Sequence, residues 1–88
     1  MQVTYFFTRN PRCLDDATLG FIQAVTLYGV YVGIGKTPAG QMFVSFGADF
    51  VNTDALLQLV GDGGNFGLRR LTPDELAATR FPDHVGGE

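Results

Sequence analysis

The order of strand-like and helix-like segments along the chain is the feature that most constrains its fold. Residues 2–8 combine alternation with β-branched and aromatic side chains, which is typical of a half-buried strand. Residues 30–34, 42–46 and 66–71 have a similar character. Helical periodicity lies between the first and second of these segments, and again between the third and fourth. The order is therefore strand, helix, strand, strand, helix, strand.

The starts of the two internal helices can be read from capping residues. Asp15 is expected to cap the first helix, because a carboxylate there can accept hydrogen bonds from the first free N–H groups. Phe21, Val25 and Tyr28 fall on one face of that helix and are expected to pack on the sheet. Asn52 is the corresponding capping residue of the second helix.

The clearest local pattern is Thr72-Pro73-Asp74-Glu75. It combines a capping box with Pro at the first helical position and acidic residues at the positive end of the helix dipole. This pattern predicts a short third helix that ends near Arg80. Phe81-Pro82 should stop it, and residues 82–88 are expected to form a flexible tail.

Two successive strand–helix–strand units predict an α+β fold, the ferredoxin-like βαββαβ sandwich. We expect a four-stranded antiparallel sheet of order 4-1-3-2, two helices on one face, and a short C-terminal helix. Right-handed crossovers leave few other topologies. Residues 1–81 should form this single domain. The second face of the sheet stays open unless something covers it.

Alternation of side chains assigns residues to that open face. In the first strand the even-numbered residues are polar except Phe6, so we expect them to face outward and Tyr5 and Phe7 to face the helices. In the third strand Met42, Val44 and Phe46 are expected to face inward. The predicted interaction face consists of Phe6, Tyr31, Gln41 and Phe43. An exposed aromatic patch of this kind is typical of a contact surface.

Several arrangements could shelter these aromatic side chains. The final helix could fold back over the face with Leu76, Ala77 and Phe81. Two copies of the chain could pair sheet to sheet as a homodimer, a protein partner could bind, or bases of a single strand could stack there. If the face assignment is shifted by one residue, the aromatic side chains belong to the core.

The stretch from Ala39 to Phe46 resembles the third-strand octapeptide of RNA-recognition-motif domains, which share this element order. Ala39 stands where that family has a basic residue, Gln41 where it has the first stacking aromatic, and Met42 where it has a small residue. The residues that match are Gly40, Phe43, Val44 and Phe46. The resemblance covers residues 2–71 and implies that Phe6 and Phe43 occupy base-stacking positions.

Charge weighs against nucleic acid as the main partner. The 88-residue chain has a net charge of −3 and a single Lys among its six basic residues, whereas nucleic-acid binding usually relies on a basic face. Four arginines lie in two pairs that a folded chain could bring together as a small anion-binding or partner-binding patch. These are Arg9, Arg12, Arg69 and Arg70.

The stretch Gly35-Lys36-Thr37 looks like the end of a phosphate-binding loop, but its surroundings exclude that function. The loop needs glycine at the position of Val30 and a helix directly after the threonine. Pro38 instead favours extended geometry at Thr37, and a strand follows. We therefore expect a strand end and a hairpin turn here.

Other chemistry-bearing residues are isolated. Cys13 lies at a helix start and is the one cysteine, so no intrachain disulfide forms. A small enzyme that uses Cys13 or the arginine loop is a minor alternative. His84 has no companions of the kind that a metal or acid–base site needs. We expect no metal, no cofactor, no membrane segment, and a cytoplasmic location.

The expected function is therefore that of a non-enzymatic protein-interaction module, acting through the aromatic sheet face or an exposed sheet edge. Compact acidic domains of this kind resemble phage or mobile-element accessory proteins, including anti-CRISPR inhibitors that bind a host protein. The alternative is a single-stranded RNA-binding or DNA-binding domain like the RNA-recognition motif.

Overall fold

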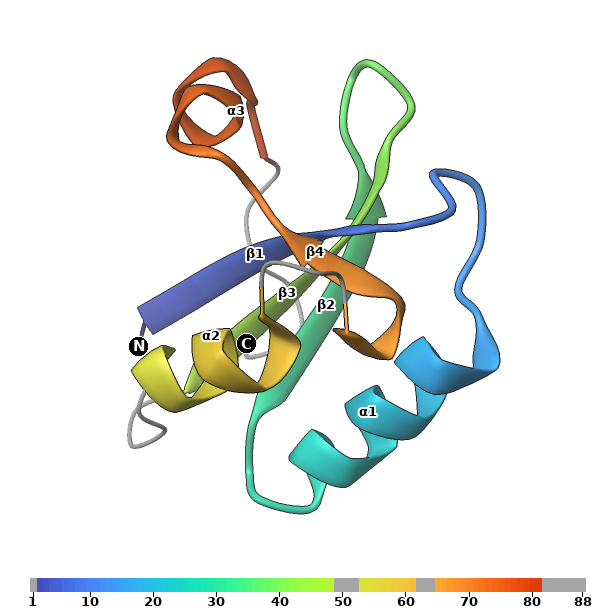
Figure 1. Cartoon of the computed structure of the whole chain (residues 1–88), viewed down its shortest axis with the longest axis vertical. Helices are drawn as coiled ribbons and strands as arrows, with labels where there is room; N and C mark the ends of the chain where they lie inside the picture. The colour runs from blue at the N-terminus through green and yellow to red at the C-terminus, as the bar shows by residue number, and fades with distance from the viewer. Residues whose placement is uncertain (1, 49–52, 62–64, 82–88) are drawn as a thin grey trace.

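The computed structural model describes residues 2–48, 53–61 and 65–81, and its strands form one four-stranded antiparallel sheet (Figure 1). The strands are β1 Gln2–Thr8, β2 Tyr31–Lys36, β3 Met42–Ala48 and β4 Leu68–Arg70. Their order is β2-β3-β1-β4, which is the predicted order counted from the opposite edge. The α+β architecture and the sheet order are thus confirmed.

Three α-helices and a short 3₁₀ helix connect and follow the strands. They are α1 Asp16–Thr26, α2 Thr53–Val60, η1 Asn65–Gly67 and α3 Pro73–Ala78. The fourth strand begins later than predicted because η1 occupies its expected first residues. Asp15 caps α1 as expected, since its carboxylate accepts a 2.8 Å hydrogen bond from the N–H of Thr18. The predicted cap Asn52 and the predicted tail, 82–88, lie outside the described residues.

Helices α1 and α2 lie over one face of the sheet, and the core fills the space between (Figure 1). Phe21 and Val25 of α1 and Val60 of α2 meet the sheet there. Rings from three elements form a continuous chain, because Phe46 makes edge-to-face contacts with both Phe6 and Phe21 at centroid distances of 5.7 Å. Such contacts stabilise a core beyond the burial of apolar area alone.

The prediction that Phe6 faces the open side of the sheet is wrong. Phe6 is completely buried in the core and pairs across the sheet with Val44. The even-numbered residues of β1 therefore face the helices. Thr8 is tolerated there, although it is polar, because its buried hydroxyl donates a hydrogen bond to the carbonyl of Asn10.

The correction reverses the other side of β1 as well. Tyr5 and Phe7, predicted to face the helices, lie on the opposite face of the sheet with Phe43. The assignment of β3 is correct, since Val44 and Phe46 are in the core. Tyr31 is about half exposed, and its position in β2 places it on the outer face as expected.

The segment before β4 contacts α1 through hydrogen bonds and ring stacking. The buried Thr18 hydroxyl lies 2.8 Å from both the Phe66 carbonyl oxygen and an Asp15 carboxylate oxygen. Phe66 stacks on Phe21 at 4.6 Å and has a φ of 60°, which is unusual for a residue other than glycine. Gly67, with a φ of 72°, then leads into β4.

Candidate interaction surface

The outer face of the sheet carries an aromatic cluster that is covered from within the chain. Phe81, just after α3, stacks on Tyr5 with ring centroids 4.1 Å apart and meets Phe43 edge to face at 5.1 Å. Phe7 lies 6.2 Å from the same ring. As a result Phe43 and Phe7 are buried, although neither touches the helical core layer. The alternative in which Phe81 folds back over this face is confirmed, whereas Leu76 and Ala77 of α3 are exposed.

An ion pair between β4 and α3 joins the helix that precedes Phe81 to the sheet. The Arg69 guanidinium donates two hydrogen bonds to the Glu75 carboxylate, at 2.8 and 2.7 Å. The carbon of the same guanidinium lies 5.1 Å from the centre of the Phe7 ring, which adds a cation–π contact. Glu75 also closes the predicted capping box, in which it and Thr72 each accept a hydrogen bond from the other's N–H.

Each charge of this pair shifts the pKa of the other group. Hydrogen bonds from the Arg69 guanidinium, and then from the Thr72 N–H, lower the pKa of Glu75 to about 2. The same carboxylate raises the pKa of Arg69. Each charge is therefore stabilised mainly by the other.

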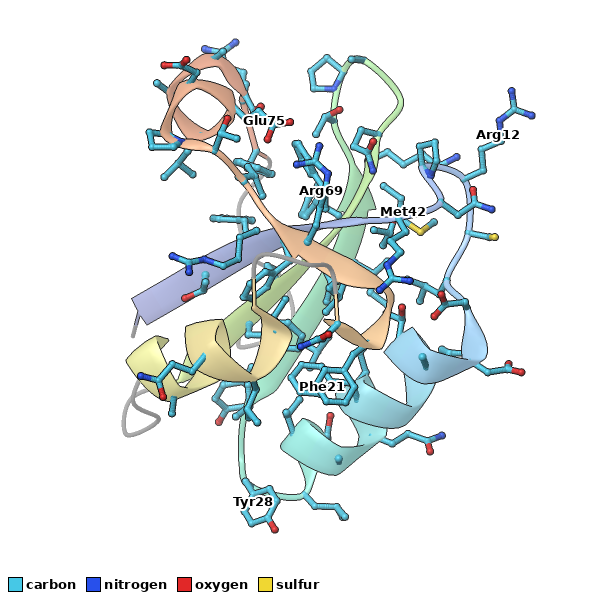
Figure 2. The ribbon with its side chains drawn as sticks, in the orientation of Figure 1. Arg12, Phe21, Tyr28, Met42, Arg69 and Glu75 are labelled. Atoms are coloured by element: carbon cyan, nitrogen blue, oxygen red, sulfur yellow. The ribbon has the colours of Figure 1, made fainter. Side chains whose placement is uncertain are left out.

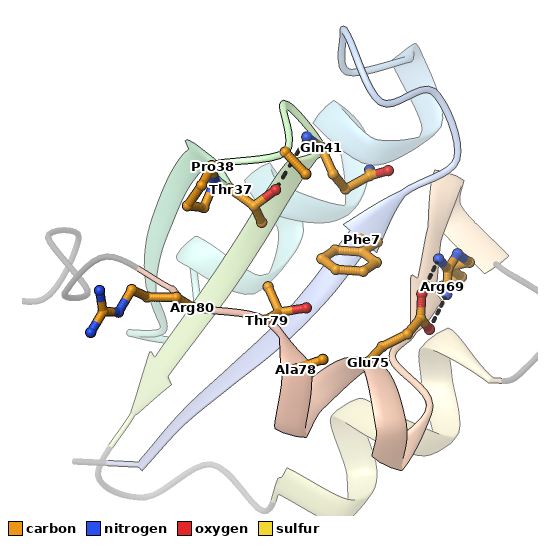
Figure 3. Close-up of a pocket in the computed structure, with 10 residues that line it drawn as sticks. Phe7, Thr37, Pro38, Gln41, Arg69, Glu75, Ala78, Thr79 and Arg80 are labelled. Carbon is orange, nitrogen blue, oxygen red and sulfur yellow. Dashed lines mark hydrogen bonds and ion pairs between the residues drawn. The ribbon is translucent and has the colours of Figure 1, made fainter.

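A hollow of about 360 Å³ opens beside this pair, between α3 and the turn that joins β2 to β3 (Figure 3). Phe7 is one of the residues that line it, and Thr37 and Gln41 line the wall at the turn. The Gln41 amide is engaged with the carbonyls of Thr8 and Met42. Arg80 extends away from the hollow, so its charge is not directed into it. The hollow therefore presents a polar rim around an aromatic side chain.

The four arginines predicted to form one patch do not gather. Arg69 and Arg70 are consecutive on β4, so their side chains leave the sheet on opposite faces. Arg9 lies near Asp15, whose pKa is lowered mainly by hydrogen bonds from Thr18 and also by the Arg9 charge. Arg12 points into solvent from the loop before α1, away from Arg69 (Figure 2). The prediction of a common anion site is wrong.

The remaining isolated residues add no catalytic or metal group to what is described. Cys13 is exposed in the loop before α1, and His84 lies outside the described residues. Within residues 2–48, 53–61 and 65–81, no three acidic, His or Cys side chains are grouped so that they could hold a metal ion. None of the helices in the same ranges has the length and apolar character needed to cross a bilayer.

A different surface follows from the sheet order. β2 is an edge strand, and in the described part of the chain it pairs with β3 alone. The stretch that looked like a phosphate loop forms the end of this strand and its turn, as predicted. The ring of Phe43 lies against Gly35, where a methyl group would come within 2.9 Å of it. Gly35 therefore gives an aromatic neighbour close access to the backbone.

The hairpin shows which backbone groups of β2 point away from the sheet. The N–H of Thr37 donates a hydrogen bond to the Gln41 carbonyl at 2.9 Å. Thr37 and Gln41 continue the register in which Lys36 pairs with Met42 and Gly35 with Phe43, so they form a hydrogen-bonded pair of the β2–β3 ladder. In an antiparallel pair the N–H and C=O groups of alternate residues turn toward the partner strand. The odd-numbered residues of β2 therefore bond to β3. Val32, Ile34 and Lys36 direct their N–H and C=O groups to the free edge.

Exposed apolar side chains are concentrated beside this edge. Of the eight large hydrophobic residues that are exposed among those described, four lie within positions 27–34. Leu27 and Tyr28 are 87% and 82% exposed, and Tyr31 and Ile34 about half. Figure 2 shows Tyr28 extending into solvent at the end of α1. We call Leu27, Tyr28, Tyr31, Ile34 and the free backbone of β2 the β2 edge surface.

Sequence reasoning identified part of this surface. Tyr31 was expected to be exposed. Tyr28 was expected to pack on the sheet, because helical spacing would place it on the same face as Phe21 and Val25. The helix ends before Tyr28, at its C-cap Leu27, so helical spacing no longer applies. Gly29 is a typical helix-ending residue, but α1 ends three residues before it, at Thr26.

Comparisons with protein-family models, curated proteins and solved structures found no match to this chain.

Proposed function

We propose that this chain is a non-enzymatic protein-binding module that accepts an extended segment of a partner along the free edge of β2. The observation that carries the proposal is the β2 edge surface itself, where unpaired strand backbone lies beside half of the exposed large hydrophobic residues that are described. Strand addition uses backbone hydrogen bonds for affinity and alternate side chains for specificity. Such a binding mode also suits the inhibitor role expected from the chain's composition.

The amino-acid content of β2 supports this proposal. Natural edge strands usually carry charged residues, Pro or bulges that discourage pairing with another chain. β2 has the sequence Tyr-Val-Gly-Ile-Gly-Lys, with one charge at its last position and no Pro. The edge is therefore chemically open to a further strand. Leu27 and Tyr28 extend the contact at one end with apolar area that favours a protein partner.

We propose the ferredoxin-like topology for the supporting fold. The order of elements β1, α1, β2, β3, α2, β4 and the sheet order β2-β3-β1-β4 support it. In this arrangement β2 is an outer strand, and the helices pack on one face of the sheet rather than along its edge.

Binding of single-stranded nucleic acid has weaker support. Of the two base-stacking positions implied by the resemblance, Phe6 is in the core and Phe43 is beneath Phe81. Bases could stack on Tyr5 and Phe43 only after Phe81 had left. The net charge of −3 also disfavours phosphate contacts.

The proposal can be tested by affinity capture from cell extract, with and without nuclease treatment, using three forms of the protein. Ile34→Lys adds a charge to the free edge, and Leu76→Lys makes the same change at a similarly exposed position on α3. We expect a protein that binds the native chain and Leu76→Lys but not Ile34→Lys. Capture that is equal for all three forms, or that disappears with nuclease, would overturn the proposal.

A further inference from the structure

We infer that the strand accepted at the β2 edge is β2 of a second copy of this chain, so that two sheets join into one across a twofold axis at Gly33. This inference rests on the proposed strand-accepting edge and names its partner. It replaces the sheet-to-sheet dimer considered from the sequence, because Phe81 already occupies the aromatic part of that face.

The backbone directions restrict how two such edges can pair. Val32, Ile34 and Lys36 direct their hydrogen-bonding groups outward, so an antiparallel copy must oppose these residues to each other. With the axis at Gly33, Val32 of each copy faces Ile34 of the other, and each such pair exchanges two hydrogen bonds. Registers centred on Val32 or Ile34 satisfy the same rule.

Side chains favour the register centred on Gly33. It places the β-branched Val32 opposite the β-branched Ile34 on the helix side of the sheet, which is a favourable cross-strand pair. On the outer side it places Tyr31 of one copy opposite Gly35 of the other. The ring of Phe43 already covers Gly35 on that side, so the tyrosine ring meets an aromatic neighbour there.

The other two registers pair less well. An axis at Ile34 sets the Lys36 side chain opposite Val32, and an axis at Val32 sets Tyr31 opposite Gly33 and leaves Gly35 without the tyrosine. The Gly33 register also pairs the whole segment from Tyr31 to Gly35 with itself. The sequence Tyr-Val-Gly-Ile-Gly is thus self-complementary in side-chain size around its central residue.

Disulfide trapping tests this register directly. Val32→Cys and Ile34→Cys are made separately with Cys13→Ser, because the exposed native thiol would otherwise react. Directly opposed residues of a hydrogen-bonded pair have Cα atoms about 5.5 Å apart, which a disulfide can span. Diagonal neighbours are separated by roughly 7–8 Å, which is too far.

We expect disulfide-linked dimers in a redox-buffered mixture of the two variants, and several-fold less in either variant alone. Cross-linking of Ile34→Cys alone, or of Val32→Cys alone, would replace the proposed register by the one centred on that residue. Light scattering of the native chain should show a mass that rises toward twice that of one chain with concentration. Ile34→Lys should stay monomeric, and Leu76→Lys should behave as the native chain does.

This experiment separates the two proposals. A native chain that stays monomeric at every concentration, with no cross-link in the mixture, overturns the self-pairing even if Ile34→Lys still abolishes capture of another protein. A cross-linked dimer, combined with capture of another protein that Ile34→Lys does not reduce, supports the self-pairing. It overturns the proposed binding of another protein and leaves self-association as the role of the edge.

Discussion

Phe81 stacks on Tyr5 with the two ring planes inclined by only 18°. The contact joins the end of the described chain to the first strand and closes the outer face of the sheet over Phe43. The sheet therefore has aromatic packing on both sides, with helices on one side and the Phe81 ring after α3 on the other. Among the described residues, this packing leaves the β2 edge open and closes the aromatic part of the sheet face.

Replacing Phe81 with alanine should expose this face. We expect the free energy of unfolding to fall by about 1–3 kcal/mol, less than the roughly 3–5 kcal/mol of a fully buried Phe, because Phe81 is partly exposed. Urea unfolding measures the change. Leu76→Ala, at an exposed position of α3, is the control and should cost about 0.5 kcal/mol. Equal losses in the two variants would show that Phe81 does not hold the face closed.

The position of Phe6 makes a second prediction. Because its ring is completely buried against Val44 and Phe46, Phe6→Ala should lower the free energy of unfolding by about 3–5 kcal/mol. Tyr31→Ala, on the half-exposed outer side of β2, should cost less than about 1 kcal/mol. If Phe6→Ala does not fold, Phe6→Leu should show a smaller loss in the same direction. A Phe6 variant as stable as Tyr31→Ala would contradict the core position.

The error at Phe6 shows where sequence reasoning reaches its limit. Tyr5, Phe6 and Phe7 are consecutive aromatics, so alternation permits either face, and the polar Thr4 and Thr8 favoured the wrong one. Thr8 can be buried because its hydroxyl donates a hydrogen bond to the carbonyl of Asn10 in the following loop. No pattern in the sequence indicates that contact. The helix start at Asp15 and the capping box at Thr72 were predictable because they depend on neighbouring residues only.

The candidate surface was also predictable from the sequence only in part. The sheet order, and with it the edge position of β2, follows from the order of elements and from the handedness of crossovers. The pairing of Arg69 with Glu75 does not, because it joins a strand to the next helix over six residues and belongs to no helical spacing. The place of Phe81 also depends on tertiary contacts, with Tyr5 and Phe43, so it could be only one of several alternatives from the sequence.

Acid should weaken the attachment of α3. The folded pKa of Glu75 is lowered from its ordinary 4.5 to about 2, chiefly by the Arg69 hydrogen bonds. The ionised carboxylate therefore stabilises the fold at pH values above 4.5, and this contribution is lost as the pH falls from 4.5 toward 2. The difference in unfolding free energy between the native chain and Glu75→Gln should shrink over that range. A difference that is constant with pH would show that the ion pair does not contribute.

Gly67 makes the last prediction, which concerns the junction between α1 and β4. An added Cβ there would overlap the Thr18 hydroxyl oxygen and lie 2.5 Å from an Asp15 carboxylate oxygen, at a φ of 72°. Gly40 has a similar φ of 87° but no atom within 4 Å of that position, so it isolates the backbone cost. We expect Gly40→Ala to lose about 1–2 kcal/mol of unfolding free energy. Gly67→Ala should lose about 1–3 kcal/mol more, because Thr18 and Asp15 must move out of the α1 cap. Urea unfolding of both variants measures the difference. Equal losses of unfolding free energy would mean that the close contact of Gly67 with Thr18 and Asp15 does not affect stability.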